Sequence, residues 1–420
     1  MRLNKTILTA VFFVLCSMNI FSQPVVNENS IKFESAVIAT LVGQDGLIMR
    51  TNDGGLTWTE QVSGITNVLN ANEFVTYSVG IAAVNMQVAV GENGIILKSV
   101  DEGLTWTNIP SGTIENLNDV VVYSPEMIFV CGANGTLLKS VDHAETWVPV
   151  VVATTQMLNH IAKFEPSTQA ATINAVVVGD SGTFFATTNL EDWYQLTIPT
   201  TENLLSVTST GDLLVAAGTN GTILKSVDKG ITWIALTSGV TTKIYDLAFV
   251  NPVTVIGSSE NGVMVRSVDA GDNWSVITTP ATLDLFALNF GSETFGISTG
   301  AGGTEIYTID GGATWLSSLN TASAINMQKE TVKLDQNYPN PFNPSTIINY
   351  TVTDNSNISM KVYDMTGREV KTLVNSFQNA GTYSVSFNAA NLSSGIYFYV
   401  LRVNSGSNEI TKTMRMILTK

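Results

Sequence analysis

Tryptophan is spaced almost evenly along this chain. The 420-residue sequence contains seven tryptophans. They are Trp58, Trp106, Trp147, Trp193, Trp233, Trp274 and Trp315. Neighbouring tryptophans are 48, 41, 46, 40, 41 and 41 residues apart. Because a period of about forty residues is the signature of a repeat architecture, each interval is expected to be one structural unit.

The residues before each tryptophan repeat as well. Gly91-Glu92-Asn93-Gly94 leads into a run that ends at Trp106, and Gly218-Thr219-Asn220-Gly221 leads in the same way to Trp233. An aspartate stands five residues before six of the tryptophans. These residues are Asp53, Asp101, Asp142, Asp228, Asp269 and Asp310. In the fourth copy Asn189 replaces the aspartate, and one residue is missing before Trp193.

Each unit is predicted to contain four short strands, since Gly-rich turns separate apolar, β-branched runs. In the sixth unit the runs are Ile244 to Val250, Thr254 to Gly257, Val263 to Ser267, and Trp274 to Thr278. No segment of useful length has helical periodicity. The predicted fold class is all-β, with a seven-bladed β-propeller over residues 30–320 followed by a small antiparallel β-sandwich.

The sequence Ser/Thr-x-Asp-x-Gly-x-Thr-Trp resembles the Asp-box, or BNR, repeat. With the preceding Gly-x-x-Gly it is most similar to the propellers of the photosystem II stability and assembly factor family. The aspartate is expected to bind backbone amides of its own turn, and the tryptophan to lie between adjacent blades. Because seven equivalent positions around a ring cannot converge on one site, these residues are interpreted as structural. No metal or cofactor is expected.

Resemblance to a sialidase would require three clustered arginines. The mature propeller has only Arg50 and Arg266, both in the frame position that Lys98 occupies in its own repeat. A glycoside hydrolase would instead need two facing carboxylates. Asp119 and Asp246 each lie 28 residues before a tryptophan, in blades that are nearly opposite. They are the weak catalytic candidates; an aspartate that caps a strand or turn is the alternative.

Two intervals are longer than the basal period, with extra residues in 64–85 and 153–174. They contain Asn70, Asn72 and Tyr77, then His160 and Gln169. Lengthened loops on a rigid scaffold are a usual place for recognition, although neutral insertion explains them equally well. His160 lies outside the boxes, where a satisfied polar group is more common than a base or a ligand.

Charge and cysteine content exclude several classes of protein. The chain has 20 basic and 35 acidic residues and a net charge of −15. Residues 23–331 hold 10 basic and 30 acidic residues, so an acidic propeller that does not bind nucleic acid is predicted. The two cysteines rule out a disulfide scaffold. Cys131, in an apolar run, is expected in the core.

The N-terminus predicts export. Arg2 and Lys5 precede an apolar run from Ile7 to about Ile20, and Ser22 lies before a plausible cleavage point. This pattern is typical of a signal peptide, assigned to residues 1–22. No other stretch is long and apolar enough to span a membrane, so no transmembrane segment is expected in the mature protein.

The composition changes after Trp315. A polar linker is predicted at residues 321–333, followed by alternating strands at 347–352, 359–363, 381–387, 396–403 and 411–418. Residues 334–420 closely resemble the type A C-terminal sorting domain of type IX secretion cargo. The residues that carry the resemblance are Pro339, Pro341, Phe342, Pro344, Gly367, Arg368, Gly381, Gly395 and Tyr397. The resemblance implies a Gram-negative host, the type IX translocon and a cell-surface sortase as partners, and release or surface attachment of the cargo.

The sequence therefore predicts an exported propeller that is found outside the cell or on the outer-membrane surface. The preferred function is a non-enzymatic module that binds a glycan or a protein. A secreted glycoside hydrolase is one alternative, and an envelope assembly or scaffold factor is another. The ligand, the oligomeric state and the way in which the ring closes are left open by the sequence.

Overall fold

The computed structural model describes residues 26–79, 82–164, 172–319, 332–352, 355–364, 368–405 and 408–420. The predicted signal peptide and most of the predicted linker lie outside these ranges. The chain divides between Ser318 and Leu319 into two compact units, and each is described by itself. In the described residues no helix is long and apolar enough to cross a membrane.

The first unit contains seven antiparallel sheets, each built from consecutive strands of one segment. Blade 1 has β1 (Glu28–Phe33), β2 (Ala39–Gly43), β3 (Ile48–Thr51) and β4 (Thr59–Glu60). Blade 2 has β5 (Leu69–Val79), β6 (Ala82–Gly91), β7 (Ile96–Ser99) and β8 (Thr107–Asn108). Blade 3 has β9 (Leu117–Ser124), β10 (Met127–Gly132), β11 (Leu137–Ser140) and β12 (Val148–Pro149). Blade 4 has β13 (Leu158–Lys163), β14 (Ala175–Gly179), β15 (Phe184–Thr187) and β16 (Trp193–Gln195).

The remaining blades follow the same order. Blade 5 has β17 (Leu204–Thr210), β18 (Leu213–Gly218), β19 (Thr222–Ser226) and β20 (Ile234–Thr237). Blade 6 has β21 (Ile244–Asn251), β22 (Thr254–Ser259), β23 (Met264–Ser267) and β24 (Ser275–Ile277). Blade 7 has β25 (Leu285–Phe290), β26 (Gly296–Gly300) and β27 (Glu305–Thr308), and a single bridge from Tyr307 to Leu316 replaces its fourth strand. The predicted seven-bladed β-propeller is confirmed.

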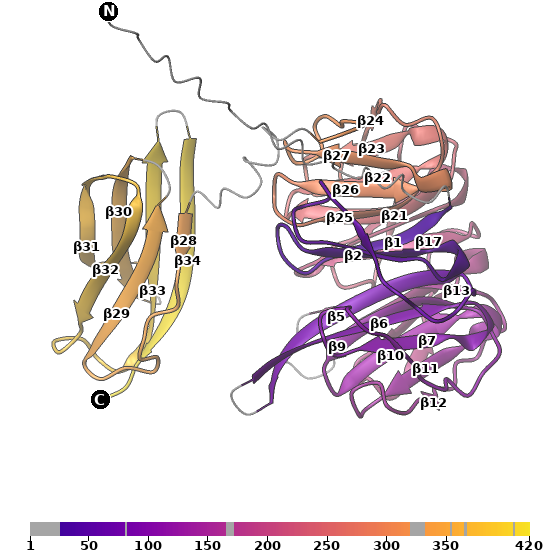
Figure 1. Ribbon diagram of the computed structural model, residues 1–420, viewed down its shortest axis with the longest axis horizontal. Coiled ribbons are helices and arrows are strands. Elements are labelled where there is room, and N and C mark those ends of the chain that lie inside the picture. The colour runs from indigo at the N-terminus through magenta and orange to yellow at the C-terminus, as the bar shows by residue number, and fades with distance from the viewer. Residues whose placement is uncertain are drawn as a thin grey trace, which may run out of the picture. The chain divides into compact units, whose positions relative to one another are not determined.

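The blades close into a ring without a shared strand. Strand β1 contacts β25 and β26 of the last blade and also β5 of the second (Figure 1). The amide of Phe33 donates to Asn289 Oδ1 at 3.1 Å, and the amide of Gly302 donates to Asn27 Oδ1 at 3.1 Å. In the part of the chain that the structure describes, closure therefore depends on side chains that cross the contact between blades 7 and 1.

A short 3₁₀ turn joins the second and third strands of every blade. These turns are η1 (Gln44–Gly46), η2 (Glu92–Gly94), η3 (Ala133–Gly135), η4 (Asp180–Gly182), η5 (Thr219–Gly221), η6 (Glu260–Gly262) and η7 (Ala301–Gly303). Their middle residue has a left-handed backbone, which explains the frequent asparagine there. A Cβ atom on Gly94 would lie 2.1 Å from the Thr113 carbonyl oxygen, so the third position requires glycine.

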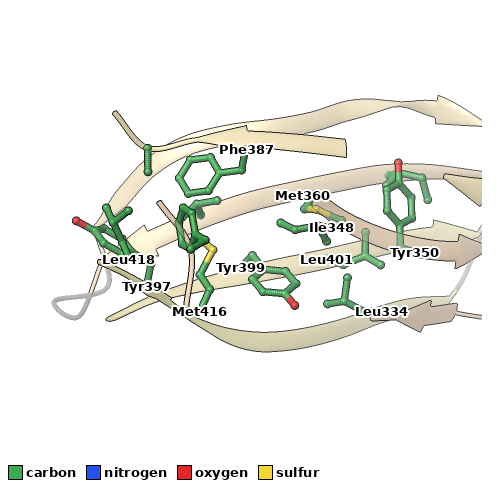
Figure 2. Close-up of a cluster of buried hydrophobic side chains, with 14 of the residues drawn as sticks. Leu334, Ile348, Tyr350, Met360, Phe387, Tyr397, Tyr399, Leu401, Met416 and Leu418 are labelled. Atoms are coloured by element: carbon green, nitrogen blue, oxygen red, sulfur yellow. The ribbon is translucent and has the colours of Figure 1, made fainter. Parts of the chain in front are cut away.

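The second unit is an antiparallel sandwich. One sheet has the order β28 (Val332–Leu334), β29 (Ser345–Val352), β32 (Gly381–Asn388). The other has the order β31 (Glu369–Gln378), β30 (Ser356–Asp364), β33 (Gly395–Ser405), β34 (Asn408–Leu418). Their inner faces enclose a core that includes Tyr350, Met360, Phe387 and Tyr399 (Figure 2).

Two features of this unit differ from the sequence interpretation. Strand β31 was not expected, because most of its side chains are exposed and do not alternate. Strand β28 begins at Val332, so two residues of the predicted linker are part of a sheet. The reason is that Val332, Lys333 and Leu334 pair with β29.

Candidate binding face at the mouth of the channel

The Asp-box residues form closed turns between the third and fourth strands. Asp101 Oδ1 accepts from the Ser99 hydroxyl at 2.8 Å and the Thr105 amide at 2.9 Å, and Oδ2 accepts from the Thr105 hydroxyl at 2.6 Å. Equivalent bonds are made by Asp53, Asp142, Asp228, Asp269 and Asp310. Each carboxylate is thus used by its own turn, and the turns belong to separate blades.

Hydrogen bonding explains the low pKa of Asp142. Bonds from the Thr146 hydroxyl and amide lower the pKa of Asp142 to about 2. In blade 4, Asn189 keeps the turn by a different route, because its Oδ1 accepts from the amides of Glu191 and Asp192. The amide side chain therefore holds the shortened box.

The box tryptophans pack against the preceding blade. Trp193 makes an edge contact with Phe129, and Trp233 makes the same contact with Phe184. The clusters of buried apolar residues place Trp106, Trp147, Trp274 and Trp315 in the same way. Trp58 instead donates to Glu305 Oε2 of blade 7 at 3.3 Å. The tryptophans therefore lie at the contacts between blades.

The basic residues of the repeat frame also join neighbouring blades. Lys98 Nζ lies 2.5 Å from Glu145 Oε1, and Lys225 Nζ lies 2.6 Å from Asp272 Oδ1. Lys139 pairs with Glu191, and Arg50 pairs with both Glu34 and Glu102. The side chains of these four cations are at most 9% exposed. They are engaged between blades and do not form the arginine cluster that a sialidase requires.

A central cavity of about 130 Å³ is lined by the inner strands of all seven blades. Asp119 and Asp246 both line it, together with Lys32 and His160. Asp119 Oδ2 accepts from the Ile161 amide of blade 4 at 2.9 Å, and Asp246 Oδ2 accepts from the Leu288 amide of blade 7 at 3.0 Å. Both candidate carboxylates thus bind the backbone of the following blade, and Asp246 Oδ1 also accepts from the Leu247 amide of its own strand at 2.8 Å.

The charges in the channel are coupled. Burial raises the pKa of Asp119, and the nearby charges of His160 and Lys32 oppose that rise. His160 Nδ1 is 3.5 Å from Asp119 Oδ2. Burial disfavours the charged form of Lys32, but Glu73, Asp119 and Asp246 outweigh it and raise the lysine pKa. Lys32 is therefore held as a cation by the acids around it.

The mouth of the channel has two different halves. In blades 1 to 4 the first bulged residue of the inner strand is an asparagine whose amide donates to a leucine carbonyl of the next blade. These residues are Asn29, Asn70, Asn118 and Asn159, with distances of 2.8–2.9 Å. In blades 5 to 7 the equivalent residues are Leu205, Tyr245 and Phe286, all half-buried. Tyr245 and Phe286 form an edge-to-face pair with ring centroids 5.1 Å apart.

The 3₁₀ turns surround this mouth. In every blade the first amide of the turn donates to the residue just before the inner strand, at 2.8–3.3 Å. We call the surface formed by η1 to η7, the loops before the inner strands and the first residues of those strands the turn face. Its turns and loops carry one acid in each blade and a single basic residue, Lys243. The acids are Asp45, Glu92, Glu115, Asp180, Glu202, Glu260 and Asp284.

Two of these acids contact the mouth directly. Asp284 Oδ2 accepts from the Tyr245 hydroxyl at 3.0 Å, and Asp180 Oδ1 accepts from Asn159 Nδ2 at 2.9 Å. Burial, together with the nearby Asp284 and Glu260 charges, raises the pKa of Tyr245, so this phenol stays protonated. Lys243 Nζ lies 5.9 Å from the Tyr245 ring centroid, which shows that the ring accepts a cation on its face.

Two larger hollows of the propeller follow the repeat. A groove of about 570 Å³ lies between η2 and residues 108–114 of blade 2. A groove of about 290 Å³ occupies the corresponding place in blade 5, between η5 and residues 235–240. Because the two are products of one repeated backbone, we give more weight to the smaller channel mouth, whose side chains differ between blades. The described residues contain no group of three or more His, Cys, Asp or Glu residues suited to a metal ion.

The longer intervals take different forms. The first extends β5 and β6 into a hairpin that projects beyond the neighbouring strands (Figure 1). Tyr77 on this hairpin contacts the His143 ring of blade 3, with centroids 5.1 Å apart. Asn70 and Asn72 lie in β5, which pairs with β6, rather than in a loop, and both donate to backbone carbonyls of neighbouring blades. His160 lies in the channel strand β13, and Gln169 lies outside the described residues.

The sorting-motif residues hold the ends of the sandwich together. Phe342 is buried, and its amide donates to the Ile417 carbonyl. The peptide bonds before Pro339 and Pro341 are cis. Arg368 Nε donates to Asp364 Oδ2 at 3.0 Å, and the Tyr397 hydroxyl donates to the Ser393 carbonyl at 2.9 Å. Gly367 lies outside the described residues.

Comparison with protein families agrees with the two-part organisation. Residues 336–417 match the secretion system C-terminal sorting domain, and residues 19–115 match the photosynthesis system II assembly factor YCF48. The sorting domain marks the chain as cargo of the type IX secretion system. No curated protein sequence matches the chain.

Solved structures with the same fold include two YCF48 propellers and a WD40 propeller. YCF48 bound to a D1 peptide is 19% identical with a TM-score of 0.56, and covers 68% of this chain and 94% of its own. YCF48 from Cyanidioschyzon merolae is 17% identical with a TM-score of 0.55, covering 68% and 97%. The Doa1 WD40 domain is 11% identical with a TM-score of 0.54, covering 68% and 94%. At these identities the likeness is one of fold.

Proposed function

We propose that the propeller is a non-enzymatic recognition module that binds a basic segment of a partner protein on its turn face. The observation that carries this proposal is the composition of that face. An apolar and aromatic half-ring of Leu205, Tyr245 and Phe286 lies at the channel mouth, inside a ring of one acid per blade. Such a surface complements lysine and arginine side chains, whose stems pack on apolar groups while their charges meet carboxylates.

Two further observations favour a protein ligand over catalysis. Asp119 and Asp246, the candidate catalytic acids, each accept a backbone amide from the next blade, which is a structural use of both groups. One of the structurally similar YCF48 propellers is bound to a peptide. A propeller of this architecture therefore has room for a peptide on its surface.

We also infer where the module acts. The sorting domain supports passage across the inner membrane by the signal peptide and across the outer membrane of a Gram-negative bacterium by the type IX translocon. A cell-surface sortase would then remove residues of the sorting domain. The propeller would meet its partner outside the cell or on its surface, where its acidic turn face attracts basic proteins at low ionic strength.

A peptide array tests the proposal. Residues 24–319 would be applied to 15-residue peptides of lysine-rich, neutral and acidic composition, and in parallel to a panel of polysaccharides. We expect salt-sensitive binding to the lysine-rich peptides. Tyr245→Ala should weaken it by about tenfold, as expected for one aromatic contact residue of a binding site.

The matched control is Tyr194→Ala, which removes a partly exposed tyrosine from the outer strand β16, away from the mouth. This variant should bind as the wild type does. Equal weakening by both variants, preference for acidic peptides, or cleavage of any polysaccharide would each contradict the proposal.

A further inference from the structure

The contact between blades 7 and 1 differs from the six other contacts between blades. At those six, an apolar residue of the third strand packs with the first residue of the next inner strand, and both are at most 1% exposed. The pairs are Ile48 with Leu69, Ile96 with Leu117, Leu137 with Leu158, Phe184 with Leu204, Ile223 with Ile244, and Met264 with Leu285. At the contact that closes the ring, the equivalent residues are Glu305 and Glu28.

A third position at this contact is polar as well. Thr299 pairs with Glu305 across β26 and β27, and residues paired in this way point to the same face of a sheet. The equivalent residue in blade 2 is Val90, which is buried in the apolar cluster of Ile96 and Leu117. Thr299 is fully buried, and its hydroxyl has no hydrogen-bond partner in the described structure. Glutamate therefore replaces an apolar residue at two positions of the closing contact alone, whereas the third position is also polar in blade 6, where the buried Ser258 pairs with Met264.

The two glutamates have different surroundings. Glu305 Oε2 accepts from the Tyr307 hydroxyl and from Trp58 Nε1, so two donors stabilise its negative charge. Glu28 is completely buried, and neither of its carboxyl oxygens has a hydrogen-bond donor among the described residues. Burial, followed by the charge of Glu305, raises the pKa of Glu28 to about 9. The hydrogen-bond donors thus assign the negative charge to Glu305 and the proton to Glu28.

We propose that the propeller ring is closed by a proton: Glu28 is a neutral carboxylic acid opposite the Glu305 carboxylate, and its ionisation loosens blade 1 from blade 7. Two ionised carboxylates in this buried contact would repel each other. The titratable groups that bear on Glu28 are Glu305 and Tyr307, both on β27. Since these blades share no strand, side-chain contacts carry much of the closure.

The direction of the pH effect follows from proton linkage. The pKa of Glu28 is higher in the folded protein than its ordinary value of 4.5, so between pH 4.5 and about 9 the folded state binds more protons than the unfolded state. The contribution of this group to stability is greatest below pH 4.5 and falls as pH rises through that window. The folding equilibrium constant should fall by up to about tenfold per pH unit from this group.

Urea unfolding between pH 5 and pH 9 tests the proposal on the predicted mature chain, residues 23–420. Glu28→Leu restores the residue type that the other blades use, and Glu28→Gln keeps the size of the side chain without a titrating proton. Both variants should lose most of the pH slope of the wild type, and Glu28→Leu should have the higher urea midpoint at pH 8. Glu60→Gln removes an exposed acid from the same blade and should keep the wild-type slope.

Hydrogen exchange locates the effect. Relative to peptides from β21 in blade 6, peptides that cover β1 should lose protection as pH rises in the wild type but not in Glu28→Gln. A wild-type pH slope in Glu28→Gln would overturn the proposal. So would stabilisation of the wild type by millimolar calcium or magnesium that disappears in Glu28→Gln, because the carboxylates would then share a cation rather than hold a proton.

Discussion

At the residue scale, aspartate side chains stabilise turns at some positions and contacts between blades at others. The box aspartates bind only their own turns, whereas Asp119 and Asp246 of the channel bind the next blade. Both uses consume the lone pairs of the carboxylate. The two carboxylates that line the channel, Asp119 and Asp246, are therefore occupied by backbone amides.

Replacement of a box aspartate measures how much its turn contributes to the stability of the fold. Asp142→Ala removes acceptors for the Thr146 amide, the Thr146 hydroxyl and the Ser140 hydroxyl. Each hydrogen bond contributes about 1 kcal/mol, and exposure of this turn to solvent reduces that contribution. We therefore expect a loss of about 1–2 kcal/mol in the free energy of unfolding. Asp142→Asn should lose less, because Asn189 holds the equivalent turn of blade 4.

The pH dependence of this variant has a definite sign. The folded-state pKa of Asp142 is depressed to about 2 from 3.8, so its contribution is present above pH 3.8 and is lost as pH falls toward 2. Urea midpoints at pH 7 and pH 3 measure this difference. A gap between wild type and Asp142→Ala that is larger at pH 3 than at pH 7 would show that the turn does not depend on the ionised carboxylate.

At the element scale, the inner strands are the parts that define both channel and ring. Each begins with a bulge, which places one side chain at the mouth and the next against the following blade. Asp246 occupies the second of these positions in β21 and connects three strands, since it binds Ser206 of β17 and Leu288 of β25. Its removal should therefore weaken the ring rather than an activity.

Asp246→Ala leaves the buried Leu288 amide without its acceptor, which should cost about 1–3 kcal/mol of unfolding free energy. Asp212→Ala, which removes an exposed carboxylate paired only loosely with Lys229, should change it by less than about 0.5 kcal/mol. Urea unfolding gives both values. If Asp246→Ala instead unfolds like the wild type and abolishes cleavage of a polysaccharide, the glycoside hydrolase alternative is correct.

Strands with a repeated local pattern could be predicted from the sequence, and contacts between blades could not. The strands of blade 6 were expected within about two residues of β21 to β24, because turn residues mark their ends. Of the asparagines at the mouth, only Asn70 was singled out, as part of a lengthened loop, although Leu69-Asn70, Leu117-Asn118 and Leu158-Asn159 recur in the sequence. Their partners lie 40 or more residues away, and a bulge leaves no trace in periodicity.

The closing contact shows the same limit. Glu28 lies before the first tryptophan, so the repeat frame does not single it out, and only its register with Leu69 and Leu117 shows that a leucine is missing. Strand β31 was not predicted for a different reason. It is a sheet edge with few buried side chains, and burial is what produces the alternation that sequence analysis detects.

At the scale of the whole molecule, the chain forms two units with separate hydrophobic cores. The propeller core is distributed over the contacts between blades, and the sandwich has a core of its own, from Leu334 to Leu418. Because neither core needs residues of the other, the sorting domain should be separable from the propeller without unfolding it. Export and recognition can then be tested independently.

Removal of residues 332–420 tests whether the sorting domain directs export. The boundary is placed before β28 because that strand belongs to the sandwich. The truncated chain, which keeps the predicted signal peptide, should cross the inner membrane and accumulate in the periplasm, since it then lacks the domain that the type IX translocon recognises. Fractionation and protease accessibility of intact cells measure where it resides. Residues 332–420 fused to an unrelated periplasmic reporter should carry that reporter to the surface. Surface display of the truncated chain, or a reporter retained in the periplasm, would show that the signal for export across the outer membrane lies elsewhere in the sequence.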